Sequence, residues 1–503
     1  MADDAVTSPA SPQTAVPVAR PLRAADPMDL ERLAAMTDRA GLIRPDGAEG
    51  SATIDPYLAE PRDKLRGRAA ALLRPRETAE VAAMIGYLND RHIPVVPMSG
   101  GTGLVGGQVF ADMTGLPDPV LISLERMDRI RALSPEDGAM VVEAGVTLQT
   151  VQEAAAGAGR LFPLAMASQG TCRIGGNLAT NAGGVQVLRY GNARELVLGV
   201  EAVLADGSIH HGLKRLRKDN MGYDLRGLLV GSEGTLGLIT AAALKLFPAP
   251  GEVVTGMLAV PDPTAAVALL HALRDRLGDG LTAFELIAAQ GPAFVAAQHP
   301  DWSDPLEDSP PWRVLLELTG PAEGGLQARA EAALEALFEE GLATDGVLAT
   351  SEAQRQALWW LRETIPEANR KRGAVASHDV SVPLSAIPAF IDAAGAAVAR
   401  VHPALAVNCF GHVGDGNLHF NIFPPEGAAL AAWRGHARAA SAAVHEAALA
   451  LDGSLAAEHG IGRVKAQALA EHADPAKLAA MRAIKAALDP NGILNPGAVL
   501  TIT

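Results

Sequence analysis

Cysteine and long apolar runs are scarce in this sequence. Its 503 residues include only two cysteines, Cys172 and Cys409, so a disulfide framework is not expected and a reducing compartment, the cytoplasm, is predicted. We expect both thiols to be buried. No stretch reaches the roughly 20 uninterrupted apolar residues of a membrane span, and the N-terminus has no basic start before an apolar core. Residues 1–26 are therefore interpreted as a flexible tail, and no membrane span is expected.

Positive charge is also in short supply. The sequence has 42 Lys and Arg against 57 Asp and Glu, which gives a net charge of −15. Repulsion from phosphates argues against a nucleic-acid partner. Hydrophobic residues make up 49% and charged residues 20%, which is typical of a folded globular protein. A chain of this length exceeds one hydrophobic core, so two or three domains are expected.

The residue pattern changes near residue 250. Residues 27–250 begin with a helical segment and a β-α-β pattern, in which "AALLRP" and "IPVVP" are strands and Thr78 is expected to cap the helix between them. Residues 251–460 alternate long Ala/Leu-rich helices with short strands such as "WRVLLELTG", which predicts a separate α+β domain. Residues 461–503 form a C-terminal segment with one more helix, "PAKLAAMRAIKAALD".

The stretch "PVVPMSGGTGLVGG" contains G-x-G-x-x-G at Gly101, Gly103 and Gly106. A nicotinamide-binding turn requires a helix directly after the third glycine, whereas "QVFADMTGLPDPV" follows here and contains glycine and prolines. Nicotinamide binding is therefore not expected. The small residues 99–103 can still bring backbone N–H groups close to a phosphate, and a plain surface turn is the alternative.

Two further glycine-rich segments follow, "PLAMASQGTCRIGGNLATNAGG" and "GSEGTLGLIT". The first has too few apolar side chains to form a core. Its hydroxyl, amide and backbone groups are suited to hydrogen bonds with a large polar ligand. Three such clusters in one half of the chain are difficult to explain as chance turns.

Polar residues with metal-binding capacity gather in two later segments. In "GHVGDGNLHFNI", a turn at Gly414-Asp415-Gly416 would place Asn417, His419 and Asn421 on one face of a strand, with apolar residues on the other. In "AAEHGIGRVK", Glu458 and His459 precede a glycine turn. Two histidines, His412 and His419, with one carboxylate suit a Zn²⁺-like ion that keeps positions open for substrate. A buried structural histidine is the alternative for His419.

Arg362 lies in a third segment, "LWWLRETIPEANRKRGAVASHDVSVP", directly after two tryptophans and a leucine. A surface salt bridge is the common role of an arginine on a helix. A bidentate clamp on a substrate carboxylate is the functional alternative.

Taken in order, these motifs resemble the vanillyl-alcohol oxidase / p-cresol methylhydroxylase superfamily, and within it the FAD-dependent D-2-hydroxy-acid dehydrogenases of D-lactate and D-2-hydroxyglutarate. The resemblance extends from about residue 55 to 500. It implies an α+β fold, with a two-subdomain FAD-binding domain and an α+β cap domain built on an antiparallel sheet. The C-terminal segment would return to the FAD domain. Residues 99–107 contain no histidine, so FAD is expected to bind non-covalently.

The resemblance assigns roles residue by residue. His412, His419 and Glu458 would hold a divalent metal, with Zn as the first candidate and Mn as the alternative. His459 would be the catalytic base, and Arg362, Asn421 and Ser377 would lie at the substrate. FAD would be contacted by Pro97, Ser99, Gly100, Gly101, Thr102, Gly103, Pro163, Ser168, Thr171, Gly175, Gly176, Asn177, Thr180, Asn181, Glu233, Gly234, Ile239 and Asn495.

Two substrate positions depart from the dicarboxylate pattern of this branch. Ser377 stands where those relatives carry a lysine, and Pro366 stands where they carry a threonine. These two residues therefore favour D-lactate or a longer monocarboxylate over D-2-hydroxyglutarate as the substrate. His378 is a candidate replacement for the missing cation.

The implied reaction oxidises a D-2-hydroxy acid to the 2-oxo acid, with electrons passing from FAD to an electron-transfer flavoprotein, a quinone or a cytochrome. Alternatives are a non-redox flavin transferase of the alkyl-glycerone-phosphate synthase type, a non-catalytic flavoprotein, and a subunit of a glycolate-oxidase-like complex. A homodimer is compatible with all of them.

Overall fold

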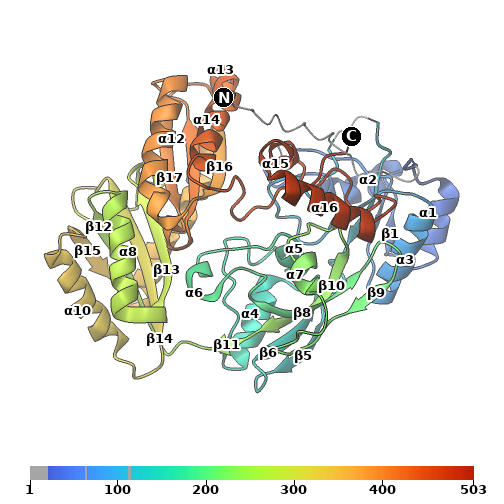
Figure 1. Ribbon diagram of the computed structural model, residues 1–503, viewed down its shortest axis with the longest axis horizontal. Helices are drawn as coiled ribbons and strands as arrows, with labels where there is room; N and C mark the ends of the chain where they lie inside the picture. Colours follow the sequence, from blue (N-terminus) through green and yellow to red (C-terminus); the bar gives the residue numbers. More distant parts are fainter. Residues whose placement is uncertain (1–20, 63–64, 112–114, 503) are drawn as a thin grey trace, which may run out of the picture.

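The computed structural model describes residues 21–62, 65–111 and 115–502, which form two units joined side by side (Figure 1). Most of the predicted tail, residues 1–20, lies outside the described residues. Residues 21–26 differ from the tail prediction, because Leu22 and Ala25 pack against a hydrophobic core and Asp26 caps the first helix. The chain crosses between the units after Pro248, which pairs with Arg160, and before Glu252, where the cap sheet begins.

The N-terminal unit has two sheets. The first has the order β1-β2-β4-β3, with β2 and β3 parallel to β4, and it packs on helices α1 and α3. The second is antiparallel, with the order β5-β6-β10-β8-β9. The strands are β1 (Leu42–Ile43), β2 (Ala71–Leu73), β3 (Val95–Met98), β4 (Val120–Ser123), β5 (Ile130–Ser134), β6 (Ala139–Glu143), β7 (Arg160–Leu161), β8 (Val197–Val203), β9 (Ile209–His211), β10 (Leu238–Lys245) and β11 (Phe247–Pro248).

The helices of this unit are short and connect or cover the strands. They are α1 (Pro27–Ala34), α2 (Gly47–Ile54), α3 (Thr78–Asp90), α4 (Leu148–Gly157), α5 (Ile174–Ala179), α6 (Val187–Tyr190) and α7 (Leu225–Leu229). The β-α-β prediction is confirmed by β2, α3 and β3. The predicted cap is wrong: Glu77 is the N-cap of α3, and Thr78 is its first residue and donates its hydroxyl hydrogen to Glu201 at 2.6 Å.

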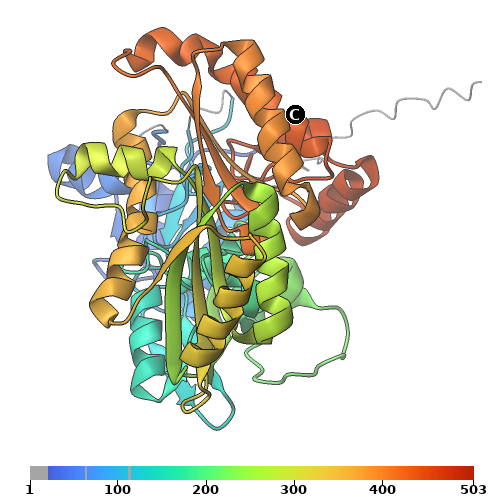
Figure 2. The same cartoon turned by 90° about the vertical axis from the view of Figure 1, so that its left-hand side faces the viewer.

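The cap unit is built on a seven-stranded antiparallel sheet with the order β15-β12-β14-β13-β17-β18-β16. Helices α8, α10, α12 and α14 share one hydrophobic core with one face of this sheet, and α9 and α11 pack on the other face (Figure 2). The bounds are β12 (Glu252–Val260), α8 (Pro263–Leu277), β13 (Leu281–Ala288), α9 (Gln290–Gln298), β14 (Trp312–Gly320), α10 (Leu326–Glu339), β15 (Asp345–Leu348), α11 (Glu352–Arg372), β16 (Ala376–Ser381), α12 (Ile387–Val401), β17 (Ala406–Gly411), β18 (Asn417–Phe423), α13 (Leu430–Trp433) and α14 (Ala437–Leu449). The α+β prediction is confirmed.

One stretch in the cap, Leu384–Val401, is apolar and long enough to cross a membrane by length and composition alone. It contains α12, whose residues Ile387, Phe390 and Ala394 are fully buried in the core of the cap. A core helix of this kind satisfies the same test of length and composition.

The C-terminal segment lies over the N-terminal unit, where α15 (Ala466–His472) and α16 (Pro475–Leu488) are drawn in dark red in Figure 1. The backbone of Val95 in β3 donates to Ile493, and the backbone of Asn495 donates to Val95. Ile493 and Leu494 are fully buried in the core beneath α3. The end of the chain is therefore part of the N-terminal unit.

Candidate active site

The first glycine loop follows β3 and lies directly against the second glycine segment. A methyl group at Gly100 would lie 2.8 Å from the carbonyl oxygen of Thr171 and 2.9 Å from the backbone nitrogen of Arg173. One at Gly176, in α5, would lie 3.3 Å from Cβ of Ser99. At Gly100 only glycine lets the two backbones approach so closely, whereas at Gly176 a methyl group would press on the side chain of Ser99. Neither glycine places a side chain in front of the backbone N–H groups, as a pyrophosphate site requires.

The structure supports the argument against a nicotinamide-binding turn. Gly101 has φ of +69°, in the left-handed region, and the place of a Cβ there is open space. No helix follows the loop in the described part of residues 99–119; the next element is β4. Instead, Gln108 folds back and donates to the carbonyl oxygen of Gly103 at 2.7 Å.

Several predicted flavin side chains are already bonded within the protein. Asn181 accepts from the backbone of Arg194, and Thr180 donates to the carbonyl oxygen of Gly176. Asn495 donates to the carbonyl oxygens of Gly107 (3.0 Å) and Glu233 (2.7 Å). These side chains hold the glycine segments together. Their direct contact with a flavin stays a prediction, as it does for the backbone or hydroxyl groups of Pro97, Ser99, Thr102, Pro163, Ser168, Thr171, Gly175, Asn177, Gly234 and Ile239.

Glu233 links the third glycine segment to the C-terminal part of the chain. Its carboxylate accepts the backbone N–H groups of Ile461 (2.7 Å) and Gly462 (2.8 Å). Burial outweighs these bonds and raises the pKa of the carboxyl group. Arg463, which the sequence analysis did not single out, donates to the carbonyl oxygens of Gly106 and Gly107 and to Asn495. Its place directly after Gly462 was the only sequence signal.

The predicted histidine segment folds as a turn between two neighbouring strands. β17 ends at Gly411, a 3-10 turn spans Val413–Asp415, and β18 begins at Asn417. Leu418, Phe420 and Ile422 are fully buried in the core, which confirms the predicted apolar face. The turn places His412 beside His419 and resets the alternation of the strand.

Glu458 joins these two histidines from a distant part of the chain. One ligand atom from each of His412, His419 and Glu458 lies within 4.8 Å of the others. A methyl group at Gly183, in the second glycine segment, would lie 2.7 Å from Oε1 of Glu458. The cluster therefore sits where the cap unit faces the glycine-rich segments of the N-terminal unit.

The cluster has the donor set that a divalent cation needs. Oε1 of Glu458 is buried and has no hydrogen-bond partner among the described residues. Burial opposes its ionisation, but the imidazole of His412 at 3.5 Å outweighs burial and lowers the pKa of Glu458 to about 2. A buried, ionised carboxylate oxygen that accepts no hydrogen bond and lies beside two imidazoles fits a Zn²⁺-like ion.

Glu285, in β13, was missed by the sequence analysis and connects His412 to Arg362. Its carboxylate lies 2.5 Å from Nδ1 of His412 and accepts from Nε of Arg362 at 2.6 Å. Burial opposes ionisation, but the positive charge of Arg362 prevails and lowers the pKa of Glu285 to about 2. The imidazole of His412 is affected in the opposite direction: burial is outweighed by Glu285 and Glu458, which raise its pKa well above the ordinary value.

Arg362 itself is buried, so the surface salt bridge is wrong for this residue. Only 6% of it is exposed, and its guanidinium lies 4.8 Å from the ring centre of Phe410. The hydrogen bond to Glu285 comes from Nε, and the two terminal Nη nitrogens donate no hydrogen bond to any residue in the described ranges. These two nitrogens remain able to hold an anion.

Asp379, in β16, was also not identified as a functional residue. It is 4% exposed and lies beside both His419 and His459. Burial opposes its ionisation, but the two imidazoles and nearby backbone N–H groups hold its pKa well below the usual range.

Comparison with known proteins agrees with this geometry. Residues 69–212 match the FAD binding domain family, and residues 249–499 match the C-terminal domain of FAD linked oxidases. The chain is 39% identical to the mitochondrial D-2-hydroxyglutarate dehydrogenase of Bos taurus, with 89% of this chain and 80% of that protein covered. The chain belongs to the FAD-linked oxidases of the vanillyl-alcohol oxidase / p-cresol methylhydroxylase family.

Other relatives of this FAD-linked oxidase carry two activity names. The D-2-hydroxyglutarate dehydrogenase of Xanthomonas citri pv. viticola is 38% identical, with 85% of this chain and 88% of that protein covered. A putative mitochondrial D-lactate dehydrogenase of Schizosaccharomyces pombe is 34% identical, with coverage of 90% and 85%. The predicted resemblance is thus confirmed.

Solved structures of lower identity share the fold. Substrate-bound p-cresol methylhydroxylase has a TM-score of 0.70 at 17% identity, with 94% of this chain and 96% of that chain covered. An alkyldihydroxyacetonephosphate synthase has a TM-score of 0.70 at 16% identity, with coverage of 96% and 88%. The predicted fold, an FAD-binding domain with an antiparallel cap, is confirmed.

The suggested role of His378 in this FAD-linked oxidase is wrong. His378 points to the opposite face of β16 from Asp379, where its ring contacts the carbonyl oxygen of Phe420 and the hydroxyl of Ser441. Burial lowers its pKa to about 4, so it is neutral near neutral pH. Ser377, in contrast, pairs in register with Asn421 and is exposed at the rim of the cluster.

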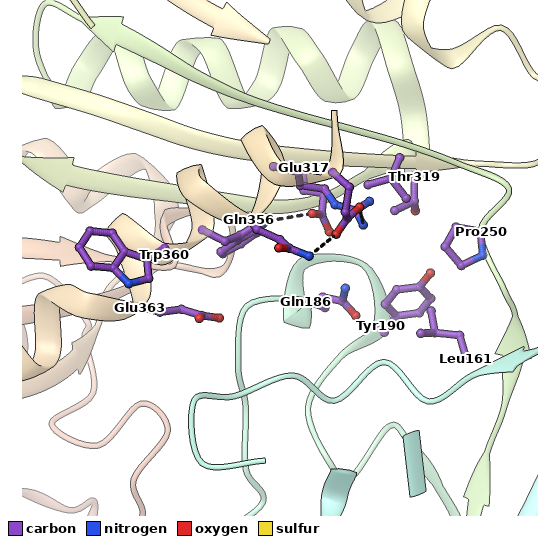
Figure 3. Close-up of a pocket in the computed structure, with 13 residues that line it drawn as sticks. Leu161, Gln186, Tyr190, Pro250, Glu317, Thr319, Gln356, Trp360 and Glu363 are labelled. Atoms are coloured by element: carbon purple, nitrogen blue, oxygen red, sulfur yellow. Dashed lines mark hydrogen bonds and ion pairs between the residues drawn. The ribbon is translucent and has the colours of Figure 1, made fainter. Parts of the chain in front are cut away.

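A cavity of about 460 Å³ lies between the two units but does not contain the cluster (Figure 3). Gln186 and Tyr190 from the N-terminal unit face Trp360 and Glu363 of α11 across it. Arg362, although adjacent in sequence, is bonded to Glu285 and does not line this cavity. The candidate site of the oxidase is therefore the histidine cluster and its surroundings.

Proposed function

We propose that this chain oxidises a D-2-hydroxy acid to the 2-oxo acid, with bound FAD as the electron acceptor. The observation that carries this proposal is the meeting of Arg362, His459 and the His412–His419–Glu458 cluster beside the glycine segments. An anion-binding guanidinium, a proton acceptor and a cation site are the groups that an α-hydroxy carboxylate needs.

Each side chain has a distinct task in this proposal. The free Nη nitrogens of Arg362 bind a carboxylate and orient the substrate. His459 accepts the hydroxyl proton at Nε2, because its Nδ1 faces Asp379 at 3.2 Å. When bound, FAD would supply the hydride acceptor for the α carbon, and a divalent ion would make the hydroxyl more acidic. The substrate thus loses one hydride and one proton, which is the two-electron oxidation to a ketone.

The same side chains indicate how the two groups would be held. Nδ1 of His412 is engaged by Glu285, so Nε2 is the nitrogen available to the ion. Zn is the first candidate and Mn the alternative, because two imidazoles and a carboxylate suit both. The glycine loops at Gly100 and Gly176 would receive the pyrophosphate of FAD.

D-2-hydroxyglutarate is the first substrate candidate and D-lactate is the second. The relatives named D-2-hydroxyglutarate dehydrogenase at 38–39% identity favour the first. Exposed Ser377, which brings no positive charge to the rim beside Asn421, favours a substrate with one carboxylate. Electron transfer to a flavoprotein, quinone or cytochrome, and location in the cytoplasm, stay predictions.

The flavin transferase is a weaker alternative. The likeness to alkyldihydroxyacetonephosphate synthase, at 16% identity, concerns the fold alone. A transferase of that type does not need the cation site formed by His412, His419 and Glu458.

Anaerobic flavin bleaching tests the proposal. The purified protein is mixed with D- and L-forms of 2-hydroxyglutarate and lactate, before and after chelation and after re-addition of Zn²⁺ or Mn²⁺. We expect a D-isomer to bleach the flavin, chelation to stop bleaching while the yellow colour remains, and the metal to restore it. A colourless protein that does not take up FAD, or full activity without metal, would contradict the proposal.

A further inference from the structure

Asp379 occupies a central position beneath the site. It lies in β16, directly opposite His419 in β18, and only 4% of it is exposed. Oδ2 accepts the backbone N–H groups of Glu458 and His459, both at 3.1 Å, and lies 3.2 Å from Nδ1 of His459. Oδ1 accepts from Nδ2 of Asn417 at 2.8 Å and lies 3.8 Å from Nδ1 of His419.

We propose that Asp379 is the positioning residue of this site, which orients the base His459 and, more weakly, the ligand His419. The inference rests on the proposed function, because it acts through the residues that the proposed function uses. No reacting atom touches Asp379 in this scheme.

The effect on His459 follows from the contact at Oδ2. The carboxylate lies within ion-pair distance of Nδ1, and its negative charge favours the tautomer that carries hydrogen on Nδ1, with the lone pair on Nε2. The two backbone N–H bonds also hold the turn at Glu458 and His459 against the sheet, so the same carboxylate fixes the positions of the base and of one metal ligand.

The effect on His419 is electrostatic, since 3.8 Å is too long for a hydrogen bond. The cluster is thus asymmetric: His412 has a direct carboxylate partner in Glu285, whereas His419 shares Asp379 with His459. Outer carboxylates of this kind orient metal-binding histidines, and their loss typically lowers metal affinity or activity by about 10- to 100-fold.

Asp379→Asn tests the proposal with little change in shape. The new amide can still accept the two backbone N–H groups at one atom. Its NH₂ would face Nδ2 of Asn417, which keeps its bond to the carbonyl oxygen of Val380 (2.9 Å), so the variant loses only the hydrogen bond to Asn417. Asp304→Asn is the matched control, because Asp304 is a largely buried carboxylate paired with Arg313 at 2.7 Å in the cap, far in sequence from the site.

Four quantities are measured for both variants: FAD content, thermal stability, Zn²⁺ affinity of the FAD-loaded protein by calorimetry, and steady-state kcat and KM. For Asp379→Asn we expect normal FAD content, Zn²⁺ binding weaker by about 10-fold, and kcat lower by about 100-fold with little change in KM. Asp304→Asn should lower stability alone. Unchanged kcat and Zn²⁺ affinity in Asp379→Asn would overturn the proposal, as would equal losses of kcat in both variants.

A double-mutant cycle with His459→Gln separates positioning from general damage. If Asp379 acts through His459, Asp379→Asn should have almost no further effect on kcat in the His459→Gln protein. If the kcat losses of the two single variants multiply in the double variant, the proposal is overturned. The two hypotheses remain distinguishable. A wild-type protein whose flavin is not bleached by any substrate refutes the proposed function. A wild-type protein whose flavin is bleached, together with an Asp379→Asn variant of equal activity, refutes only the positioning role.

Discussion

Gly100→Ala is expected to push the first glycine loop away from the second glycine segment, which contains Thr171 and Arg173. The added methyl group would lie 2.8 to 2.9 Å from Thr171, Cys172 and Arg173, and all three contacts are with backbone atoms that cannot rotate away. Ordinary contact begins near 3.4 Å, so the segments must separate by about 0.6 Å. Forcing a methyl group into such a tight place typically costs about 1 to 3 kcal/mol.

This cost should appear in FAD binding. The free protein can relieve the strain by separating the segments, but closing them again around the pyrophosphate restores it. Since 1.4 kcal/mol corresponds to a factor of ten, we expect FAD affinity to fall by about 5- to 150-fold. Flavin fluorescence titration of the apoprotein measures the affinity, and thermal unfolding with and without FAD measures the stability.

Two control variants separate contact from backbone strain. Gly101→Ala places its methyl group in open space but at φ of +69°, so it should cost about 1 to 2 kcal/mol without moving the neighbouring segment. Gly157→Ala, at the end of α4, has open space and no positive φ, and should be neutral or slightly stabilising. Wild-type FAD affinity in Gly100→Ala, or an equal loss of affinity in Gly157→Ala, would refute the argument. Gly101→Ala is compared by thermal stability alone, because Gly101 is itself a predicted FAD contact.

Three further outcomes are expected. Glu285→Gln should weaken Zn²⁺ binding by about 10- to 100-fold, measured by calorimetry, because the new amide disfavours the required tautomer of His412. It should also lower the free energy of unfolding by about 3 kcal/mol, measured by denaturant unfolding, because Arg362 loses its buried counter-charge. His378→Gln should reduce the loss of stability in acid. The pKa of His378 is about 4 in the folded protein and 6.5 in the unfolded chain, so the free energy of unfolding falls as the pH falls from 6.5 toward 4. Between pH 7 and pH 5 the wild type should therefore lose about 2 kcal/mol more than the variant. Arg463→Lys should raise the dissociation constant for FAD, because a lysine cannot hold the carbonyl oxygens of Gly106 and Gly107 and the side chain of Asn495 at once, and no change in flavin titration would count against this.

The sequence by itself determined the local features of this protein. The missing helix after Gly106 excluded a nicotinamide-binding turn, and the alternation around His419 separated a buried apolar face from a polar one. These inferences succeed because loop length, glycine content and strand alternation act between residues a few positions apart. The change of pattern near residue 250 marked the crossing between the units for the same reason.

Only the tertiary structure decided which distant residues meet. Glu285 lies in a strand with no motif of its own, and Asp379 lies in the Arg362 segment without a role assigned to it. Sheet order nevertheless places them beside His412 and His419. His378 was misassigned because its neighbours suggested a cation, whereas the alternation of β16 turns it to the opposite face. An ionised carboxylate is stabilised by charges that lie close to it in space. Glu285 and His412 are 127 residues apart in the sequence, so their contact could not be predicted from residue spacing.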